Sequence, residues 1–497
     1  MAKKTINKEL TGAQDLYNFL FEACNIIRGP VSQDNFKDYI TPLLYYKRIS
    51  DVYDEETEEA LISSGGDKEY ASLPEQHRFV IPDGCHWQEV RERTENLGAA
   101  IVGAMRQIEI ANPDTLYGVL SMFSSQKWTN KAILNDSKIR DLIEHLSKRK
   151  LGNKDYPADL MGDAYEILLK KFADDSKAQA GEFYTPRSVV RLLVHILDPQ
   201  PGETVYDPAC GSGGMLIEAI RYMHDDSLCC GSIFGQEKNV VNAAIAKMNL
   251  FLHGASDFNV MQGDTLRDPK ILQGGNIAKF DCVIANPPFS LENWGATEWS
   301  SDKYKRNIYG TPSDSCGDYA WIQHMICSMS SGKGRMAVVM PQGILFRGNQ
   351  EAEIRKQLVE SDLIEAVVTL GDKLFYGTGL SPCFLIIRRM KPAHHSGRIL
   401  MIDGSKILTQ KRAQNILAEN DIDRLYSLYQ NYSDEEDYSR IVTLQEIRDK
   451  EYNLSPNRYV VYHKEEIRPY VEVLAEFKHA YEDVKRLEKE FSLLINA

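Results

Sequence analysis

Short apolar segments alternate with segments of helical periodicity between residues 156 and 405. This alternation restricts the possible folds more than any other feature of the sequence. Strands separated by helices usually pair in parallel, and helices then cover both faces of the sheet. The last two predicted strands are joined by Gly377-Thr378-Gly379, which is too short for a helical crossover, so the final strand should run antiparallel. We therefore expect an α/β fold with a seven-stranded, mostly parallel sheet, its strands at residues 204–206, 232–235, 259–262, 281–285, 336–340, 364–370 and 383–387.

The 497-residue chain is long enough for two or three domains. Residues 1–155 are predicted to form a helical domain, because apolar residues such as Leu16, Leu20 and Ala23 recur at helical spacing. Residues 156–405 would form the α/β domain, and residues 406–497 a C-terminal extension. The basic cluster Lys148-Arg149-Lys150 is interpreted as a solvated helix end, although contact with phosphates is the alternative.

The C-terminal extension is expected to end in a helix with a seven-residue a/d pattern, which is broken once at Glu488. Such a helix either folds back on its own chain or pairs with a helix of another protein, and the pattern favours neither. Its apolar positions are Ile467, Tyr470, Leu474, Phe477, Tyr481, Val484 and Phe491.

Composition and charge exclude several classes of protein. No stretch approaches the ~18 apolar residues of a membrane span, and no apolar signal region follows Met1-Ala2-Lys3-Lys4-Thr5, so a cytoplasmic protein is expected. The nine cysteines form no C-x-x-C pair, which argues against a zinc site and a disulfide framework. The net charge of −13 disfavours a broad basic face for nucleic acid, so a DNA substrate would need local patches or a partner.

A glycine-rich turn follows the first predicted strand, in Asp207-Pro208-Ala209-Cys210-Gly211-Ser212-Gly213-Gly214-Met215. Glycines let a ligand approach the backbone closely, and the start of the next helix offers free N–H groups. The turn lacks the Lys-Ser/Thr of a phosphate-gripping loop. It therefore indicates a site for a nucleotide-like molecule, with simple packing as the alternative.

The segment Asn286-Pro287-Pro288-Phe289 follows directly on the fourth predicted strand, at the edge where open α/β sheets bind ligands. Two prolines stiffen the backbone and remove N–H donors, so the Asn286 side-chain oxygen and the Pro287 carbonyl can act together as acceptors. Two acceptors suit an amine, and Phe289 could stack on a base. A proline-rich turn with Phe289 in the core is the alternative.

Two carboxylates close the strands between these motifs. Glu237 ends the second strand, where dinucleotide folds place an acceptor for ribose hydroxyls. Asp264 follows the third strand and could accept from an adenine amino group. Either residue alone would be a common turn or capping residue, but their serial placement at successive strand ends indicates one site.

The order of these motifs resembles that in DNA amino-methyltransferases, and most closely the modification (M) subunit of type I restriction-modification systems. The resemblance spans nearly the whole chain. Gly317 is a small departure, because the family tends to have Ala there. The matching segments are Tyr45-Tyr46-Lys47-Arg48-Ile49-Ser50-Asp51, Gly181-Glu182-Phe183-Tyr184-Thr185-Pro186-Arg187, the glycine-rich turn, residues 286–289, Asp318-Tyr319-Ala320-Trp321-Ile322-Gln323-His324, Gly334-Arg335-Met336-Ala337-Val338-Val339-Met340-Pro341 and Tyr452-Asn453-Leu454-Ser455-Pro456-Asn457-Arg458-Tyr459.

The resemblance implies a Rossmann-like methyltransferase sheet, S-adenosylmethionine as cofactor and N6 of adenine as target. It assigns residues 286–289 to catalysis, Glu237 to the ribose and Asp264 to the adenine of the cofactor. The methionine end and the sulfonium would be surrounded by Glu182, Phe183, Tyr184, Thr185, Pro186, Arg187, Asp207, Gly211, Ser212, Gly213 and Gly214, and no metal is implied. Thr185 is also a predicted N-cap of the next helix.

The implied partners are double-stranded DNA, a separate specificity (S) subunit held partly by the C-terminal helices, a second M subunit and, in some complexes, a restriction (R) subunit. The target adenine would flip out of the duplex. The loop between Ser290 and Cys316, with Trp294, Lys303, Lys305 and Arg306, would lie over it, either touching phosphates or exposed to solvent.

Other activities fit the same tetrad. Methylation of cytosine N4 or of a protein glutamine uses similar acceptors, and a cofactor-binding scaffold without turnover belongs to another class. A nucleophilic role for Cys210 is disfavoured, because the C5-cytosine enzymes place their thiol after a proline at the catalytic strand; Cys210 is interpreted as a packing residue.

Overall fold

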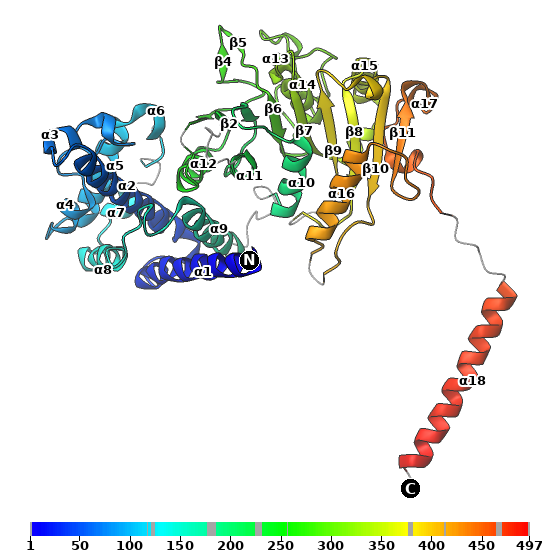
Figure 1. The fold of residues 1–497 in the computed structure, drawn as a ribbon, viewed down its shortest axis with the longest axis horizontal. Helices are drawn as coiled ribbons and strands as arrows, with labels where there is room; N and C mark the ends of the chain where they lie inside the picture. Colours follow the sequence, from blue (N-terminus) through cyan, green and yellow to red (C-terminus); the bar gives the residue numbers. More distant parts are fainter. Residues whose placement is uncertain are drawn as a thin grey trace.

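The computed structural model describes residues 2–116, 118–120, 125–175, 185–223, 231–255, 257–375, 381–411, 414–463 and 470–495. Figure 1 shows a helical region at one side, a sheet layered with helices beside it, and one long C-terminal helix that extends away from both. Among the described helices, none is long and apolar enough to cross a membrane.

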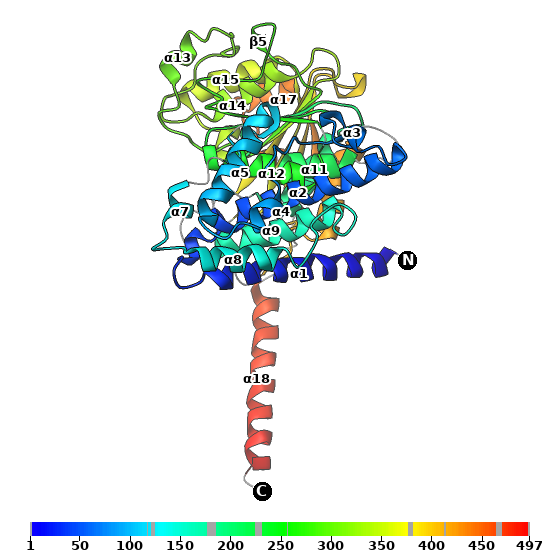
Figure 2. The same ribbon diagram turned by 90° about the vertical axis from the view of Figure 1, so that its left-hand side faces the viewer.

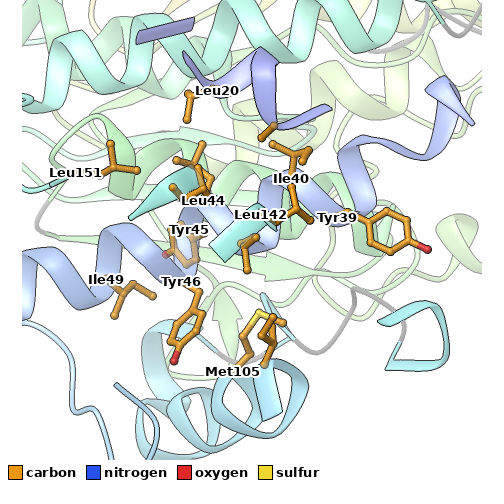
Figure 3. Packing of buried hydrophobic residues seen from close by; sticks show 14 of the residues in the cluster. Leu20, Tyr39, Ile40, Leu44, Tyr45, Tyr46, Ile49, Met105, Leu142 and Leu151 are labelled. Atoms are coloured by element: carbon orange, nitrogen blue, oxygen red, sulfur yellow. The ribbon is translucent and has the colours of Figure 1, made fainter. Parts of the chain in front are cut away.

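The N-terminal region is helical, as predicted. Its main helices are α1 (Ala2–Ile27), α2 (Lys37–Ser63), α5 (Leu97–Ala111), α8 (Asp136–Leu146) and α9 (Ala158–Asp175), with the short helices α3 (Lys68–Ala71), α4 (Trp87–Arg91), α6 (Pro113–Leu116) and α7 (Ser125–Thr129) between them. Their apolar faces share one buried cluster, part of which is drawn in Figure 3 around Leu44, Tyr45 and Tyr46. The cluster extends to Met248 and Phe251 of α12 (Val240–Leu252), so the helical region packs against the α/β region.

The motif at residues 45–51 holds α2 to the segment before α9. Arg48 is 1% exposed, donates to the carbonyl of Tyr156 at 3.0 Å and also bonds the carbonyl of Leu151. Asp51 pairs with Lys47 and accepts from the Leu151 N–H at 2.6 Å. These charges are buried but partnered, so this motif is structural in the described chain.

The basic cluster 148–150 lies just after α8. Its middle residue, Arg149, pairs with Asp15 of α1 at 2.7 Å, donates to the Tyr156 hydroxyl and packs over Phe19. The neighbouring lysines are exposed. Arg149 therefore joins two helices, which neither interpretation of the cluster anticipated.

All seven predicted strands are present, but the sheet has nine strands, in the order β11-β10-β8-β9-β7-β6-β1-β2-β3. The predicted seven are β1 (Val205–Asp207), β2 (Ile233–Glu237), β3 (Phe258–Gln262), β6 (Cys282–Ala285), β7 (Arg335–Pro341), β8 (Ile364–Leu370) and β9 (Pro382–Arg388). β9 runs antiparallel to both β7 and β8, as expected from the short connection, although residues 376–380 lie outside the described chain. A separate hairpin is formed by β4 (Leu272–Gln273) and β5 (Asn276–Ile277).

The seven-strand prediction was wrong at one edge of the sheet. β10 (Arg398–Gly404) pairs in parallel with β8, and β11 (Ser439–Thr443) pairs antiparallel with β10. Every residue of β8 is buried, so its free edge requires a further strand to satisfy the backbone. The sheet thus extends into the segment that had been assigned to the C-terminal extension.

Helices cover both faces of the sheet. One face packs against α10 (Arg187–Leu197), α11 (Gly214–Met223), α12 and α16 (Glu419–Asn431). The other face packs against α14 (Asp318–Ser328), α15 (Asn349–Glu360) and α17 (Leu444–Asp449). The short helix α13 (Ala296–Ser300) lies in the loop after β6. The alternation of side chains is visible in β6, where Val283 faces the second layer and Ile284 the first.

The predicted C-terminal helix is present as α18 (Tyr470–Ile495). Figures 1 and 2 show it projecting from the body in two perpendicular views. Five apolar positions of the heptad pattern are largely exposed: Tyr470, Phe477, Tyr481, Val484 and Phe491. Ile467 lies outside the described residues. These apolar side chains of α18 are not buried against the rest of the chain in this structure. Of the two alternatives, folding back on its own chain or pairing with another protein, the first is therefore not observed.

Candidate active site

The glycine-rich turn joins β1 to α11 at the carboxyl edge of the sheet. Gly211 and Gly213 have φ of +53° and +85°, a region that other residues rarely adopt. Cys210 lies beneath the turn, where its sulfur would be 3.0 Å from a Cβ placed on Gly235. Burial raises the pKa of the Cys210 thiol well above its usual range, which disfavours a reactive thiolate.

Two carboxyl groups lie against this turn. Glu237, at the end of β2, accepts from the Gly211 N–H at 3.0 Å and from the Asn239 N–H at 2.7 Å. Asp207, at the end of β1, is 2% exposed and accepts from the Ala209 N–H. Burial raises the pKa of Asp207 to about 8, and the nearby Glu237 adds to the rise. Burial also raises the pKa of Glu237. Two desolvated carboxyl groups at one turn favour a ligand with positive charge.

Asp264 follows β3, parallel to β2. Its Oδ1 accepts from the N–H groups of Leu266 and Arg267 at 3.2 Å each, and its Oδ2 pairs with Lys238 at 2.9 Å. Because Lys238 is 71% exposed, that pair is easily exchanged. The orientation of the Asp264 carboxylate is therefore set by hydrogen bonds within its own turn. Its role toward the cofactor stays a prediction.

Asn286 starts the Asn-Pro-Pro-Phe tetrad (residues 286–289) directly after β6. Its amide Nδ2 donates to the Thr185 hydroxyl at 2.7 Å. Its Oδ1 is buried and has no hydrogen-bond partner in the described chain. A buried oxygen without a donor is costly, so this atom marks the position of a missing N–H group. Phe289 is half-buried, with its ring 6.5 Å from that of Phe375.

The segment that precedes α10 is only partly described. Glu182, Phe183 and Tyr184 lie outside the described residues. Thr185 is not the N-cap of α10, because Pro186 occupies that position and makes no side-chain cap. The Thr185 hydroxyl is instead committed to Asn286.

Arg187, the last residue of this segment, lies among acidic side chains. It is within 3.5–3.9 Å of the carboxylates of Asp163, Glu166 and Glu218, from α9 and α11. This places Arg187 between the helical region and the α/β region, and its predicted contact with the cofactor stays untested.

The loop after the tetrad is packed against the protein. Arg306 is 1% exposed, pairs with Asp302 at 2.7 Å and donates to the carbonyls of Thr265 and Leu266. Neither alternative for the loop, contact with phosphates or exposure to solvent, holds for Arg306, because its guanidinium binds the loop to the Asp264 turn. Trp294 is also buried, whereas Lys303 and Lys305 are exposed.

Sequence reasoning gave no role to two residues near the tetrad. Asp318, the first residue of α14, accepts from the Ser290 N–H at 2.7 Å, and Arg347 donates to its other oxygen at 2.8 Å. The segment at 318–324 was noted only for its resemblance, and no spacing pattern indicates a bond across 28 residues.

Gly317 has a local explanation. A Cβ at this position would lie 2.9 Å from the Trp294 ring, so alanine would require the indole to shift. Glycine at position 317, where the family tends to have alanine, thus leaves room for the Trp294 ring.

The sheet, the glycine-rich turn after β1 and the tetrad after β6 together define an S-adenosylmethionine-dependent methyltransferase that acts on an amine. Residues 156–467 match the family model described as N-6 DNA Methylase, and residues 16–146 match that of the HsdM N-terminal domain. The chain belongs to the N-6 DNA methylase family, as a methylase (M) subunit of a type I restriction-modification system.

Relatives along most of the chain agree. The MjaVII type I methylase subunit of Methanocaldococcus jannaschii is 35% identical over 471 residues, covering 90% of this chain and 78% of that protein. The HindI methylase subunit of Haemophilus influenzae is 31% identical over 360 residues, covering 70% and 76%. The type I methyltransferase subunit of Streptococcus thermophilus has a similar crystal structure, with a TM-score of 0.77, 26% identity and coverage of 91% and 100%.

These findings establish the activity as adenine-specific DNA methylation with S-adenosylmethionine. They decide against cytosine N4, protein glutamine and a scaffold without turnover, all of which the tetrad alone allowed. The DNA substrate follows from the family.

Proposed function

We propose that Asn286 Oδ1 and the Pro287 carbonyl accept the two hydrogens of the adenine N6 amino group. The observation that supports this most is the buried Asn286 Oδ1 without a partner, beside an Nδ2 that Thr185 already holds. With the amide orientation set in this way, the oxygen is the end that remains for the substrate. Accepting both N–H groups directs the nitrogen lone pair toward an incoming methyl group.

S-adenosylmethionine would supply an electrophilic methyl group on a sulfonium. The residues present suit it: two desolvated carboxyl groups face the turn, and a cationic ligand would offset their raised pKa values. Glu237 would hold the ribose, Asp264 the adenine, and Asp207 with residues 211–214 the methionine and sulfonium region. Residues 182–187 would line the methionine end.

The target base has to leave the duplex, because N6 of a stacked adenine cannot reach Asn286. Phe289 would stack on the flipped base, and Pro287 and Pro288 keep the tetrad rigid while it does so. The amine nitrogen loses one of its two protons when it takes the methyl group. The acceptors at Asn286 and Pro287 hold the two N–H groups until that proton passes to water.

Sequence recognition is proposed to belong to a separate S subunit, with two M subunits in the complex and an R subunit in some assemblies. Family membership and the acidic chain support this division of labour. A cytoplasmic location is part of the same proposal. So is a division of the chain into a helical N-terminal part, a methyltransferase part and a C-terminal extension, with the sheet continuing beyond residue 405 to β11.

The function is tested by expressing this chain with its S subunit in cells that lack adenine methylation. We expect N6-methyladenine at one bipartite sequence across the genome, and none when either chain is omitted. Sequencing that detects modified bases provides the measurement. Methylation at many unrelated sites, or its complete absence with both chains present, would contradict the proposal.

The exposed apolar stripe of α18 is proposed to bind the S subunit. Replacing both Phe477 and Tyr481 by Asp should weaken assembly by at least about tenfold, because the few central residues of an interface, often aromatic, each cost about 2 kcal/mol or more when truncated. S-adenosylmethionine binding should be unchanged. His479→Asp, about 200° around the helix from either aromatic, is the control and should assemble normally. Titrated co-purification measures both, and equal assembly of all variants would contradict the assignment.

A further inference from the structure

A buried carboxylate, paired with a partly exposed arginine, holds the end of the tetrad. Asp318 is 0% exposed, and its two carboxylate oxygens have different partners. Oδ1 accepts from the Ser290 N–H at 2.7 Å, immediately after Phe289, and Oδ2 accepts from Arg347 Nη1 at 2.8 Å. The Cys316 thiol lies 3.3 Å from Oδ2. A fully desolvated carboxylate is costly unless its partners are well placed, as they are here.

Arg347 follows β7, and its guanidinium also pairs with Glu351 of α15 at 3.1 Å. Asp318 begins α14, so the helix N-terminus adds a favourable partial positive charge. The carboxylate at the start of α14 is thus held by the loop after β6, which contains Ser290, and by the segment before α15, which contains Arg347.

The backbone of the tetrad has little freedom between its two ends. Ala285 is paired with Val338 in the sheet, and the two prolines have fixed φ. Ser290 has a φ of +50°, which is unfavourable for a residue with a Cβ and is kept only when its surroundings impose it. The bond from its N–H to Asp318 is the contact that imposes this conformation.

We propose that Asp318, held by Arg347, is a positioning residue for methyl transfer: it fixes the exit of the tetrad and thereby the acceptors at Asn286 and Pro287. The inference rests on the proposed role of Asn286. A carboxylate can accept from Ser290 and from Arg347 with separate oxygens, whereas an amide has a single oxygen. In Asp318→Asn one of the two donors therefore faces an NH₂ group.

Asp318→Asn should lower the single-turnover rate of methylation by about 10- to 100-fold, because small displacements of reacting groups cost about this much. The affinities for S-adenosylmethionine and for DNA should stay within about threefold. Glu353→Gln, the same change at an exposed glutamate of α15 that pairs with Lys356, is the matched control and should keep the normal rate. Rapid-quench assays with labelled cofactor give the rate, and calorimetry and thermal melting report binding and folding.

A normal rate in Asp318→Asn, or a loss of the same size in Glu353→Gln, would overturn the inference. A parallel loss of cofactor affinity would overturn it as well, since the carboxylate would then be part of the fold of the whole site. If Asp318→Asn does not fold, Arg347→Lys decides: we expect about a tenfold slower rate with cofactor binding kept, and a normal rate would refute the proposal. An active Asn286→Ala enzyme would instead refute the proposed function, so the two failures are distinguishable.

Discussion

Asn286→Ala should lower the single-turnover rate of adenine methylation by on the order of 10²-fold or more, by analogy with the loss of one preorganised polar group in other active sites. The substitution removes the buried Oδ1 that has no partner in the described chain and frees the Thr185 hydroxyl from Nδ2. The remaining acceptor, the Pro287 carbonyl, cannot orient the amine alone.

Cofactor binding should survive in this variant, because Glu237 and Asp264, which are assigned to the ribose and the adenine of the cofactor, lie at the ends of other strands and are unchanged. Rapid-quench measurement with labelled cofactor gives the rate, and calorimetry gives the affinity. Asn276→Ala, the same change in the exposed β5 hairpin, is the control and should be fully active. Turnover near the normal rate in Asn286→Ala would remove this residue from the mechanism.

Glu237→Ala should weaken S-adenosylmethionine binding by about 10- to 100-fold. The carboxylate accepts from the Gly211 and Asn239 N–H groups, and losing a charged hydrogen-bond partner costs about 1.5–3 kcal/mol, where 1.4 kcal/mol corresponds to tenfold. The loss has two parts: the ribose acceptor disappears, and Gly211 is no longer held at φ +53°.

Calorimetry on the isolated subunit measures this affinity directly. The affinity of Glu237→Gln for S-adenosylmethionine should lie between those of the natural protein and Glu237→Ala, because the amide keeps one acceptor. Glu292→Ala, an exposed glutamate in the loop after β6, should bind the cofactor normally. Unchanged affinity in Glu237→Ala would show that other residues hold the ribose. Thermal melting shows whether the variant is folded.

The core of the fold was predictable because local patterns encode it. Strand β6 is apolar throughout, and the antiparallel direction of β9 follows from the length of its connection. Of the two added strands, β10 contains the apolar run Ile399-Leu400-Met401-Ile402 and was predictable from it. β11 lies in a polar segment and becomes a strand because β10 offers it an edge.

The site divides in the same way. The turn at residues 207–215 and the tetrad were located correctly at strand ends by their glycines and prolines, whose backbone chemistry is local. Arg306 was interpreted as a surface cation, although it is one of the most buried charged residues. The residues next to Arg306 in the sequence do not show whether it is exposed or buried, because its carbonyl partners at residues 265 and 266 precede it by about 40 residues.

The sequence by itself determined seven of the nine strands, the edge of the sheet at which the predicted site lies and the type of chemistry, because periodicity, glycine and proline act within a few residues of themselves. Only the tertiary structure decided which side chains meet there. The bond from Asn286 to Thr185 spans 101 residues, and that from Ser290 to Asp318 spans 28. Such contacts depend on how helices and strands pack, and packing brings together groups whose spacing along the chain follows no pattern.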